Sequence, residues 1–288
     1  MPTLSLVLIA YEMERELPRT VLSLSSAMQV GIHAEDYEII IVDNGSRRPL
    51  DEAGLQRIAS NVRVLRMPDP TPSPAPAIHL GLEAASGDLI GVWIDGARMA
   101  SPGLLKNAVA AARLHPNPVI GTFSLHLGSK TQMLSVLEGY CQSVEDELLA
   151  RCDWEKDGYR LFGVSCFAGS SPHGWFSLPN ETNALFLERS EWRRLGGGYD
   201  TRFVSPGGGL ANLDLWRRLV NDPARGVVML LGEGTFHQFH GGVATNALTS
   251  PWSDFADEYK AIRQEPYQAP VRTPLLYGAL NQYSKLLI

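Results

Sequence analysis

Residues 37–46 read YEIIIVDNGS, an apolar run that ends in a cluster of turn-forming residues. A run of this length is typical of a strand in a parallel sheet that is covered on both faces, and Asp, Asn, Gly and Ser favour turns. Similar runs occur at residues 4–10, 62–65 and 89–94, and a helical stripe of apolar residues occupies residues 14–28. This alternation predicts an α/β fold with a doubly wound, mostly parallel sheet flanked by helices.

The rest of the chain is less regular but carries further predicted elements. Five prolines between Pro68 and Pro76 predict an extended loop. We expect helices at residues 77–85, 101–115, 132–152 and 213–220, and strands at residues 183–188 and 227–231, the last followed by a glycine- and histidine-bearing loop at residues 232–242.

Composition and charge exclude several classes of protein. The 288 residues carry a formal net charge of −6, so there is no global basic field to hold nucleic acid or an anionic membrane. The three cysteines lack CxxC spacing, which predicts buried thiols in a reducing compartment and no disulfide framework. The N-terminus lacks the basic region of a signal peptide. The sequence contains no run of about 18 apolar residues, so we expect no membrane span. We therefore expect a cytoplasmic protein without a nucleic-acid partner.

The carboxyl ends of the predicted strands carry the first candidate site residues. Ligands of doubly wound sheets bind beyond these strand ends. Tyr11, with Ala10 before it, Asp43 and Asp95 all stand there in the sequence. This edge of the sheet is therefore the predicted binding site.

Five segments resemble family 2 glycosyltransferases in order and spacing: residues 6–21, 37–46, 77–87, 87–105 and 181–218. The resemblance covers roughly residues 4 to 220 and implies a GT-A fold that binds a nucleotide-diphosphate sugar. It divides the chain into a GT-A domain, which has two halves, and a C-terminal extension. The domain spans residues 1–245, with a nucleotide-binding half at 1–115 and an acceptor half at 116–245, and the extension at 246–288 either packs on the domain or forms a homodimer contact.

The resemblance also implies roles for the residues at the strand ends. Ala10 and Tyr11 would line the nucleobase pocket, and Asp43 would accept a hydrogen bond from the base; the alternative is that Asp43 only shapes its own turn. Asp95 would be the surviving acid of the DxD signature, which holds Mg²⁺ or Mn²⁺ against the diphosphate. His79 stands where the family has an asparagine before a glycine.

The chain departs from the family at the acidic positions. The DxD segment reads Asp95-Gly96-Ala97, and Arg98 follows. The family's Glu-Asp pair before the acceptor helix appears as Ala211-Asn212, and an asparagine cannot act as a general base. Either another carboxylate serves, or the mechanism is retaining, or transfer activity has been lost. The carboxylates considered for this role are Asp200, Glu233 and Asp214, and the helical geometry predicts that Asp214 points away and is mainly structural.

His237 and His240 follow the last predicted strand. Together with Asp95 they would form a divalent-cation site, and the imidazoles would favour Mn²⁺ over Mg²⁺. Two alternatives stay open. The histidines could simply bind backbone groups, or Arg98 and His240 could neutralise the diphosphate without a cation.

The resemblance thus predicts a glycosyltransferase that moves a sugar from a nucleotide-diphosphate sugar to a saccharide or related soluble acceptor, in polysaccharide biosynthesis. Two other functions are compatible with the sequence. One is a nucleotide-sugar-binding module without turnover, which the altered acidic positions favour. The other is a nucleotidyltransferase on a similar scaffold, against which the absence of a glycine-rich, lysine-bearing phosphate loop near the first strand counts.

Overall fold

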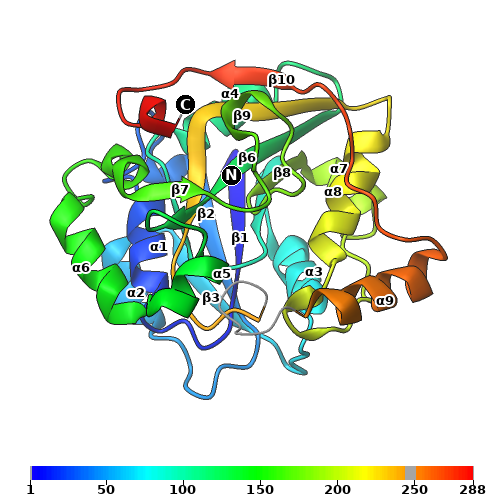
Figure 1. The fold of residues 1–288 in the computed structure, drawn as a ribbon, viewed down its shortest axis with the longest axis horizontal. Helices are drawn as coiled ribbons and strands as arrows, with labels where there is room; N and C mark the ends of the chain where they lie inside the picture. The colour runs from blue at the N-terminus through cyan, green and yellow to red at the C-terminus, as the bar shows by residue number, and fades with distance from the viewer. Residues whose placement is uncertain (1, 244–250, 288) are drawn as a thin grey trace.

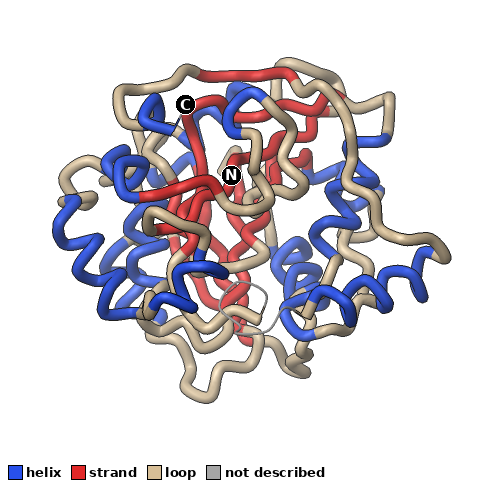
Figure 2. Tube along the Cα trace, in the orientation of Figure 1, coloured by secondary structure: helices blue, strands red, loops and turns tan. Residues whose placement is uncertain are grey.

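The computed structural model describes residues 2–243 and 251–287. A curled sheet runs through the middle of the molecule, and helices cover it on both sides (Figures 1 and 2). Its strands are β1 Leu4–Ala10, β2 Tyr37–Asp43, β3 Val62–Arg66, β4 Leu89–Trp93, β5 Arg98–Ala100, β6 Pro118–Leu127, β7 Ser165–Phe167, β8 Leu185–Glu188, β9 Gly226–His237 and β10 Leu275–Gly278.

Nine α-helices are present among the described residues. They are α1 Leu17–Leu24, α2 Glu52–Ile58, α3 Ala75–Ala84, α4 Leu104–Ala111, α5 Gln132–Ser135, α6 Gln142–Cys152, α7 Arg189–Arg194, α8 Ala211–Asn221 and α9 Trp252–Arg263. Short 3-10 helices lie at Ala34–Asp36, Val136–Glu138, Gly158–Val164, Gly174–Phe176, Pro206–Gly208 and Ser284–Leu287.

The strand order is β10-β9-β6-β8-β4-β1-β2-β3, with β5 paired to β9 and β7 paired to β6. The neighbours β3, β2, β1 and β4 are all parallel, and so are β6, β9 and β10. The antiparallel strand β8 joins these two parallel groups, because it pairs with both β4 and β6. The predicted α/β fold with a mostly parallel sheet is therefore confirmed. The parallel strands bring Ala10, Asp43 and the residues after β4 to one edge.

Two apolar cores lie on the two faces of the sheet. Side chains along β1 alternate between them, with Val7 and Ile9 on the face covered by α3, and Leu6 and Leu8 on the face covered by α1. Helix α3 packs closely on β1 because Gly81 has no side chain, and a Cβ there would lie 2.3 Å from Cγ1 of Val7. This tight packing fixes the strand ends that carry the site.

Several predicted elements differ from the structure, and the helix expected at residues 101–115 spans only Leu104–Ala111. The helix expected at residues 132–152 is broken at Gly139, which has a φ of 93° and so ends the first segment in a left-handed conformation. The helix expected at residues 14–28 covers only α1, because the hydroxyl of Ser25 donates to the carbonyl of Leu22 and ends it. Residues 232–237, expected in a loop, continue β9, because residues 234–237 pair with β6 and residues 235–237 also pair with β5.

The described part of the extension lies against the rest of the chain. Helix α9 buries Phe255 and Tyr259, and β10 adds a parallel strand to the edge of β9. Residues 244–250, which contain the predicted boundary at 245/246, lie outside the described residues. No helix among the described residues is long and apolar enough to cross a bilayer.

The cysteines do not fit the sequence prediction of buried thiols. Cys141 is exposed, and Cys152 and Cys166 are half-buried. Cys141 precedes α6 on the surface, so its side chain has no core to enter. All three cysteines are free thiols.

Candidate functional site

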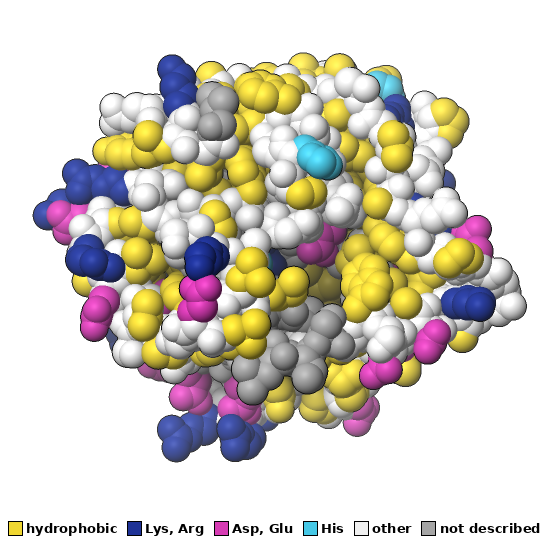
Figure 3. Space-filling view, viewed as in Figure 1, with side chains coloured by type: hydrophobic (Ala, Val, Ile, Leu, Met, Phe, Trp, Pro, Cys, Tyr) yellow, Lys and Arg dark blue, Asp and Glu magenta, His cyan; other side chains and the backbone are white. Residues whose placement is uncertain are grey.

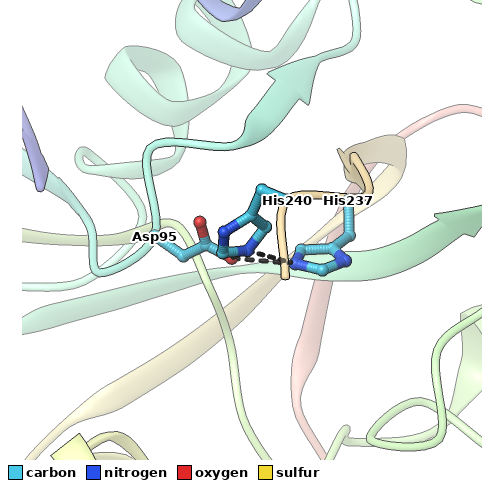
Figure 4. A group of neighbouring side chains, drawn as sticks. All are labelled: Asp95, His237 and His240. Atoms are coloured by element: carbon cyan, nitrogen blue, oxygen red, sulfur yellow. Dashed lines mark hydrogen bonds and ion pairs between the residues drawn. The ribbon is translucent and has the colours of Figure 1, made fainter. Parts of the chain in front are cut away.

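Asp95, His237 and His240 meet at the carboxyl edge of the sheet (Figure 4). Nε2 of His237 lies 3.0 Å from Oδ2 of Asp95, and Nε2 of His240 lies 3.4 Å from the same oxygen. The two Nε2 atoms are 3.2 Å apart. The structure therefore brings together the three side chains that the sequence suggested as cation ligands.

Local structure explains why Asp95 faces the imidazoles. Its Oδ1 accepts a hydrogen bond from the backbone N–H of Ala97 at 3.0 Å, which leaves Oδ2 directed at the histidines. The turn needs Gly96, because a Cβ there would lie 2.8 Å from the carbonyl oxygen of Ile9. Strand β5 then runs antiparallel to β9 and pairs Arg98 with His237.

Gln132 fixes the protonation of His237. Its amide nitrogen donates to the carbonyl of His237 at 3.0 Å, and its amide oxygen lies 2.5 Å from Nδ1 of the same ring. Because an amide oxygen only accepts, Nδ1 carries the proton, and Nε2 presents its lone pair to Asp95. Burial lowers the pKa of His237 to about 4, so the ring is neutral at neutral pH.

This donor set fits a divalent cation. Burial alone would raise the pKa of Asp95, but the positive charge that His240 carries when it is protonated outweighs burial and holds the pKa of Asp95 well below its usual value. An ionised carboxylate and an imidazole lone pair 3.0 Å apart repel each other unless a cation lies between them. One carboxylate and two imidazoles are also ligands that first-row divalent metals accept.

Arg98 supplies a buried positive charge beside this cluster. Its Nε lies 3.5 Å from Oδ2 of Asp95, and the residue is only 5% exposed. Burial lowers the pKa of the guanidinium, while Asp95 and Glu181 counteract this effect. Its Nε and Nη1 donate to no hydrogen-bond acceptor among the described residues. Buried donors of this kind fit an anionic group such as a diphosphate.

The residues predicted to contact the nucleobase lie at the ends of β1 and β2, one and two strands away from β4, the strand that leads to Asp95. Ala10 is buried at the end of β1, and Tyr11 after it is 56% exposed. Asp43 is buried and already accepts from the backbone N–H of Ser46 at 2.8 Å and from Nη1 of Arg66 at 2.9 Å. The carboxylate therefore does shape its turn, and its contact with a nucleobase stays a prediction.

His79 and Asp200 lie together in a different part of the molecule. Both line a polar cavity of about 330 Å³ between α3, the loop after α7, α8 and α9, and none of its lining residues belongs to the Asp95 cluster. Nε2 of His79 lies 2.9 Å from the carbonyl oxygen of Tyr199. Hydrogen bonds from Arg202, with support from Arg263, hold the pKa of Asp200 well below its usual value, which makes it a weak proton acceptor.

Asp214 belongs to the same arginine network. Its carboxylate is 1% exposed and accepts from Nε of Arg218 at 2.8 Å and from Nε of Arg263 at 2.6 Å. Arg263 also pairs with Asp200 at 2.9 Å. Asp214 lies in the first turn of α8 and pairs with two arginines, and its structural role stays a prediction.

Glu233 lies away from the Asp95 cluster. It precedes His237 by four residues on β9, which corresponds to about 13 Å along an extended strand. Its carboxylate is buried and accepts from the hydroxyls of Ser101 and Tyr159 and from the backbone N–H of Gly103. Glu233 therefore joins β9 to the start of α4 in this structure.

Glu233 should make stability depend on pH. Burial raises its pKa from 4.5 to about 7, so the folded state binds this proton more tightly than the unfolded state. The resulting stability is fully present below about pH 4.5 and is lost as the pH rises through 7, by about 3 kcal/mol in total. Urea unfolding at pH 5 and pH 8.5 should show this loss in the wild type but not in Glu233→Gln. The same pH dependence in both proteins would contradict the assignment.

Sequence reasoning did not single out Gln132 or Glu181 as site residues. Gln132 has no signal in the sequence, because it reaches His237 across 105 positions of the chain. Glu181 does carry a weak signal, since it opens a polar triplet directly before the apolar run of β8.

Comparison with known proteins supports the fold and gives a family. The family described as Glycosyl transferase family 2 matches residues 5–151. The solved structure of S. aureus TarS 1-349 has a TM-score of 0.57 and 14% identity, over 91% of this chain and 64% of that one. The same fragment in complex with UDP-GlcNAc has a TM-score of 0.57 and 15% identity, over 91% of this chain and 65% of that one.

The complex of that fragment with UDP has a TM-score of 0.56 and 15% identity, over 91% of this chain and 64% of that one. The chain thus spans slightly less than two thirds of the TarS fragment, and identity at this level shows a shared fold. No curated protein sequence matches the chain.

Proposed function

The chain belongs to glycosyl transferase family 2, and we propose that it transfers a sugar from a nucleotide-diphosphate sugar to a saccharide or related soluble acceptor. The observation that carries this proposal is the cluster of Asp95, His237, His240 and Arg98 at the carboxyl edge of the sheet. Ligands of this fold class bind at that edge. TarS structures contain UDP and UDP-GlcNAc, so UDP-sugars are the first donors to test.

Asp95, His237 and His240 would hold a divalent cation, with Mn²⁺ favoured over Mg²⁺ by the imidazoles. When bound, the cation would neutralise the diphosphate charge and so stabilise the leaving group. Arg98 would donate hydrogen bonds to the same diphosphate through its Nε and Nη1 atoms, which have no hydrogen-bond acceptor within residues 2–243 and 251–287. Tyr11 and Asp43 would contact the nucleobase at the neighbouring strand ends.

A nucleotide-sugar-binding module is the second candidate. Asn212 stands where an inverting relative carries its base, and Asp95 is the single acid of its turn. A module of this kind would bind the donor but release no nucleotide. Nucleotide release therefore separates the two functions, while binding alone does not.

Donor binding should raise the melting temperature. A ligand at 100 times its dissociation constant adds about 2.7 kcal/mol of stability, which corresponds to about 5 to 10 °C for a chain of this size. Thermal unfolding with UDP-GlcNAc, UDP-glucose, UDP-galactose, GDP-mannose and a TDP-sugar, each with Mn²⁺, should show such a shift for at least one donor. No shift with any donor would contradict the proposed function.

A further inference from the structure

The carboxylate of Glu181 lies beside the side-chain amide of Asn212 in α8. Asn212 lies in the first turn of α8, and its Nδ2 donates to Oε2 of Glu181 at 2.9 Å and to the carbonyl oxygen of Thr182 at 3.0 Å. Its Oδ1 accepts from the hydroxyl of Tyr199 at 3.3 Å. The amide is therefore held in one orientation, and it holds Glu181 in turn.

These contacts explain why residue 212 is an asparagine. An aspartate there would direct its oxygens at two acceptors, the Glu181 carboxylate and the Thr182 carbonyl, and would leave both without a donor. The negative charge next to α8 consequently sits on Glu181. Asn212 acts as a hydrogen-bond donor that positions this charge.

The segment that carries Glu181 is fixed at the carboxyl edge of the sheet. Oγ1 of Thr182 accepts from the backbone N–H of Thr122 at 2.8 Å, and Nδ2 of Asn183 donates to Oγ of Ser124 at 2.7 Å. Strand β8 then runs antiparallel to β4, with Leu185 opposite Val92. Residues 181–184 therefore lie beside the end of β4 that leads to Asp95.

The charge of Glu181 influences the candidate site. Its charge acts on the guanidinium of Arg98, which in turn lies 3.5 Å from Asp95. The face of the molecule shown in Figure 3 is hollowed at its centre, and acidic surface is visible inside the hollow. The carboxylate of Glu181 thus lies within electrostatic reach of Arg98, which would bind the diphosphate.

Glu181 also differs from the other candidate bases in its partners. Asp200 and Asp214 are each paired with two arginines, and Glu233 accepts several hydrogen bonds deep in the core. Oε1 of Glu181 accepts no hydrogen bond from residues 2–243 or 251–287, and no cation of these residues pairs with its carboxylate. The side chain is half-buried, so a substrate hydroxyl can reach it.

We propose that Glu181 is the general base of the transfer reaction, a role that rests on the proposed function. The proton of the acceptor hydroxyl passes to Oε1 of Glu181 while the hydroxyl oxygen forms a bond to the anomeric carbon of the donor. The bond from that carbon to the β-phosphate oxygen breaks, and its electron pair leaves with the nucleoside diphosphate. Water as acceptor follows the same balance and yields the free sugar.

Glu181→Gln tests the role of the carboxylate with little change in shape. Its amide oxygen can still accept from Asn212, so the fold should persist. Release of UDP or GDP from the five nucleotide sugars named above, with water as acceptor, should fall about 10²- to 10⁴-fold. UDP affinity, measured by isothermal titration with Mn²⁺, should stay equal or become tighter, since a negative charge near Arg98 is lost. Glu181→Asp, which keeps the carboxylate, should recover part of the rate.

Glu188→Gln is the matched control. Glu188 is at the opposite end of β8, across from Leu89 at the start of β4, so this variant should release nucleotide at the wild-type rate. A rate within tenfold of wild type in Glu181→Gln would overturn the proposal, as would a loss of rate explained by lost UDP binding. Absence of nucleotide release in the wild type itself would contradict the proposed transferase function instead.

Discussion

Asp95→Ala is expected to abolish Mn²⁺-dependent binding of UDP. Oδ2 of Asp95 is the one anionic ligand in the cluster, and both imidazoles converge on it at 3.0 and 3.4 Å. Loss of groups that only orient a metal ligand costs about 10- to 100-fold in metal affinity, so loss of a charged ligand should cost at least about 100-fold. Isothermal titration of Mn²⁺ and of UDP into the wild type and the variant measures both effects.

Asp88→Ala is the matched control for this variant. Asp88 directly precedes β4, at the opposite end from Asp95, and its carboxylate is 89% exposed beside Arg189. Its Mn²⁺ and UDP affinities should equal those of the wild type. Undiminished UDP binding in Asp95→Ala, or in wild type after exhaustive chelation with EDTA, would rule out the cation site. Arg98 and His240 would then be the groups that neutralise the diphosphate.

Asp214→Asn is expected to destabilise the fold strongly and to leave catalysis per folded molecule largely intact. The carboxylate is buried and carries hydrogen bonds from Arg218 and from two nitrogens of Arg263. Removing one partner of a buried ion pair costs about 3 to 5 kcal/mol, because the remaining charge is left uncompensated. Urea unfolding gives the stability, and nucleotide release normalised to the folded fraction gives the activity.

Asp88→Asn is the control for stability, because an exposed ion pair contributes about 1 kcal/mol or less to the free energy of unfolding.

The cavity that Asp200 and Arg263 line, together with His79, should also be disturbed in Asp214→Asn. Nucleotide release reduced by several orders of magnitude at unchanged stability would show that Asp214 is a base and that its arginine pairs are secondary.

The sequence predicts the sheet well where apolar runs are uninterrupted. Strands β1 to β4 lie within one residue of the expected ranges, because each is buried and bounded by turn residues. Breaks inside helices are harder to predict. The segment that holds Gly139 has a helical composition, but the left-handed φ of that glycine ends the 3-10 helix Val136–Glu138 that follows α5. The end of β9 also depends on pairing with β5 and β6, which local patterns do not reveal.

The candidate site is less predictable because it depends on contacts between distant positions. Asp95 could be found from the strand end, and the histidines from their place after the last strand. Glu181, in contrast, gains its environment from Asn212, 31 positions later, and Arg98 gains its burial from the surrounding sheet. His79 lies near Asp200 and not near Asp95, because α3 packs against the loop after α7.

One measurement tests the central proposal most directly. Wild-type protein is incubated with Mn²⁺ and the nucleotide sugar that gives the largest thermal shift, and the released nucleoside diphosphate is quantified over time. The cluster of Asp95, His237, His240 and Arg98 predicts steady release that stops on addition of EDTA and resumes when Mn²⁺ is restored. Saturable binding of the donor without any release of nucleoside diphosphate would contradict a transferase and leave a binding module.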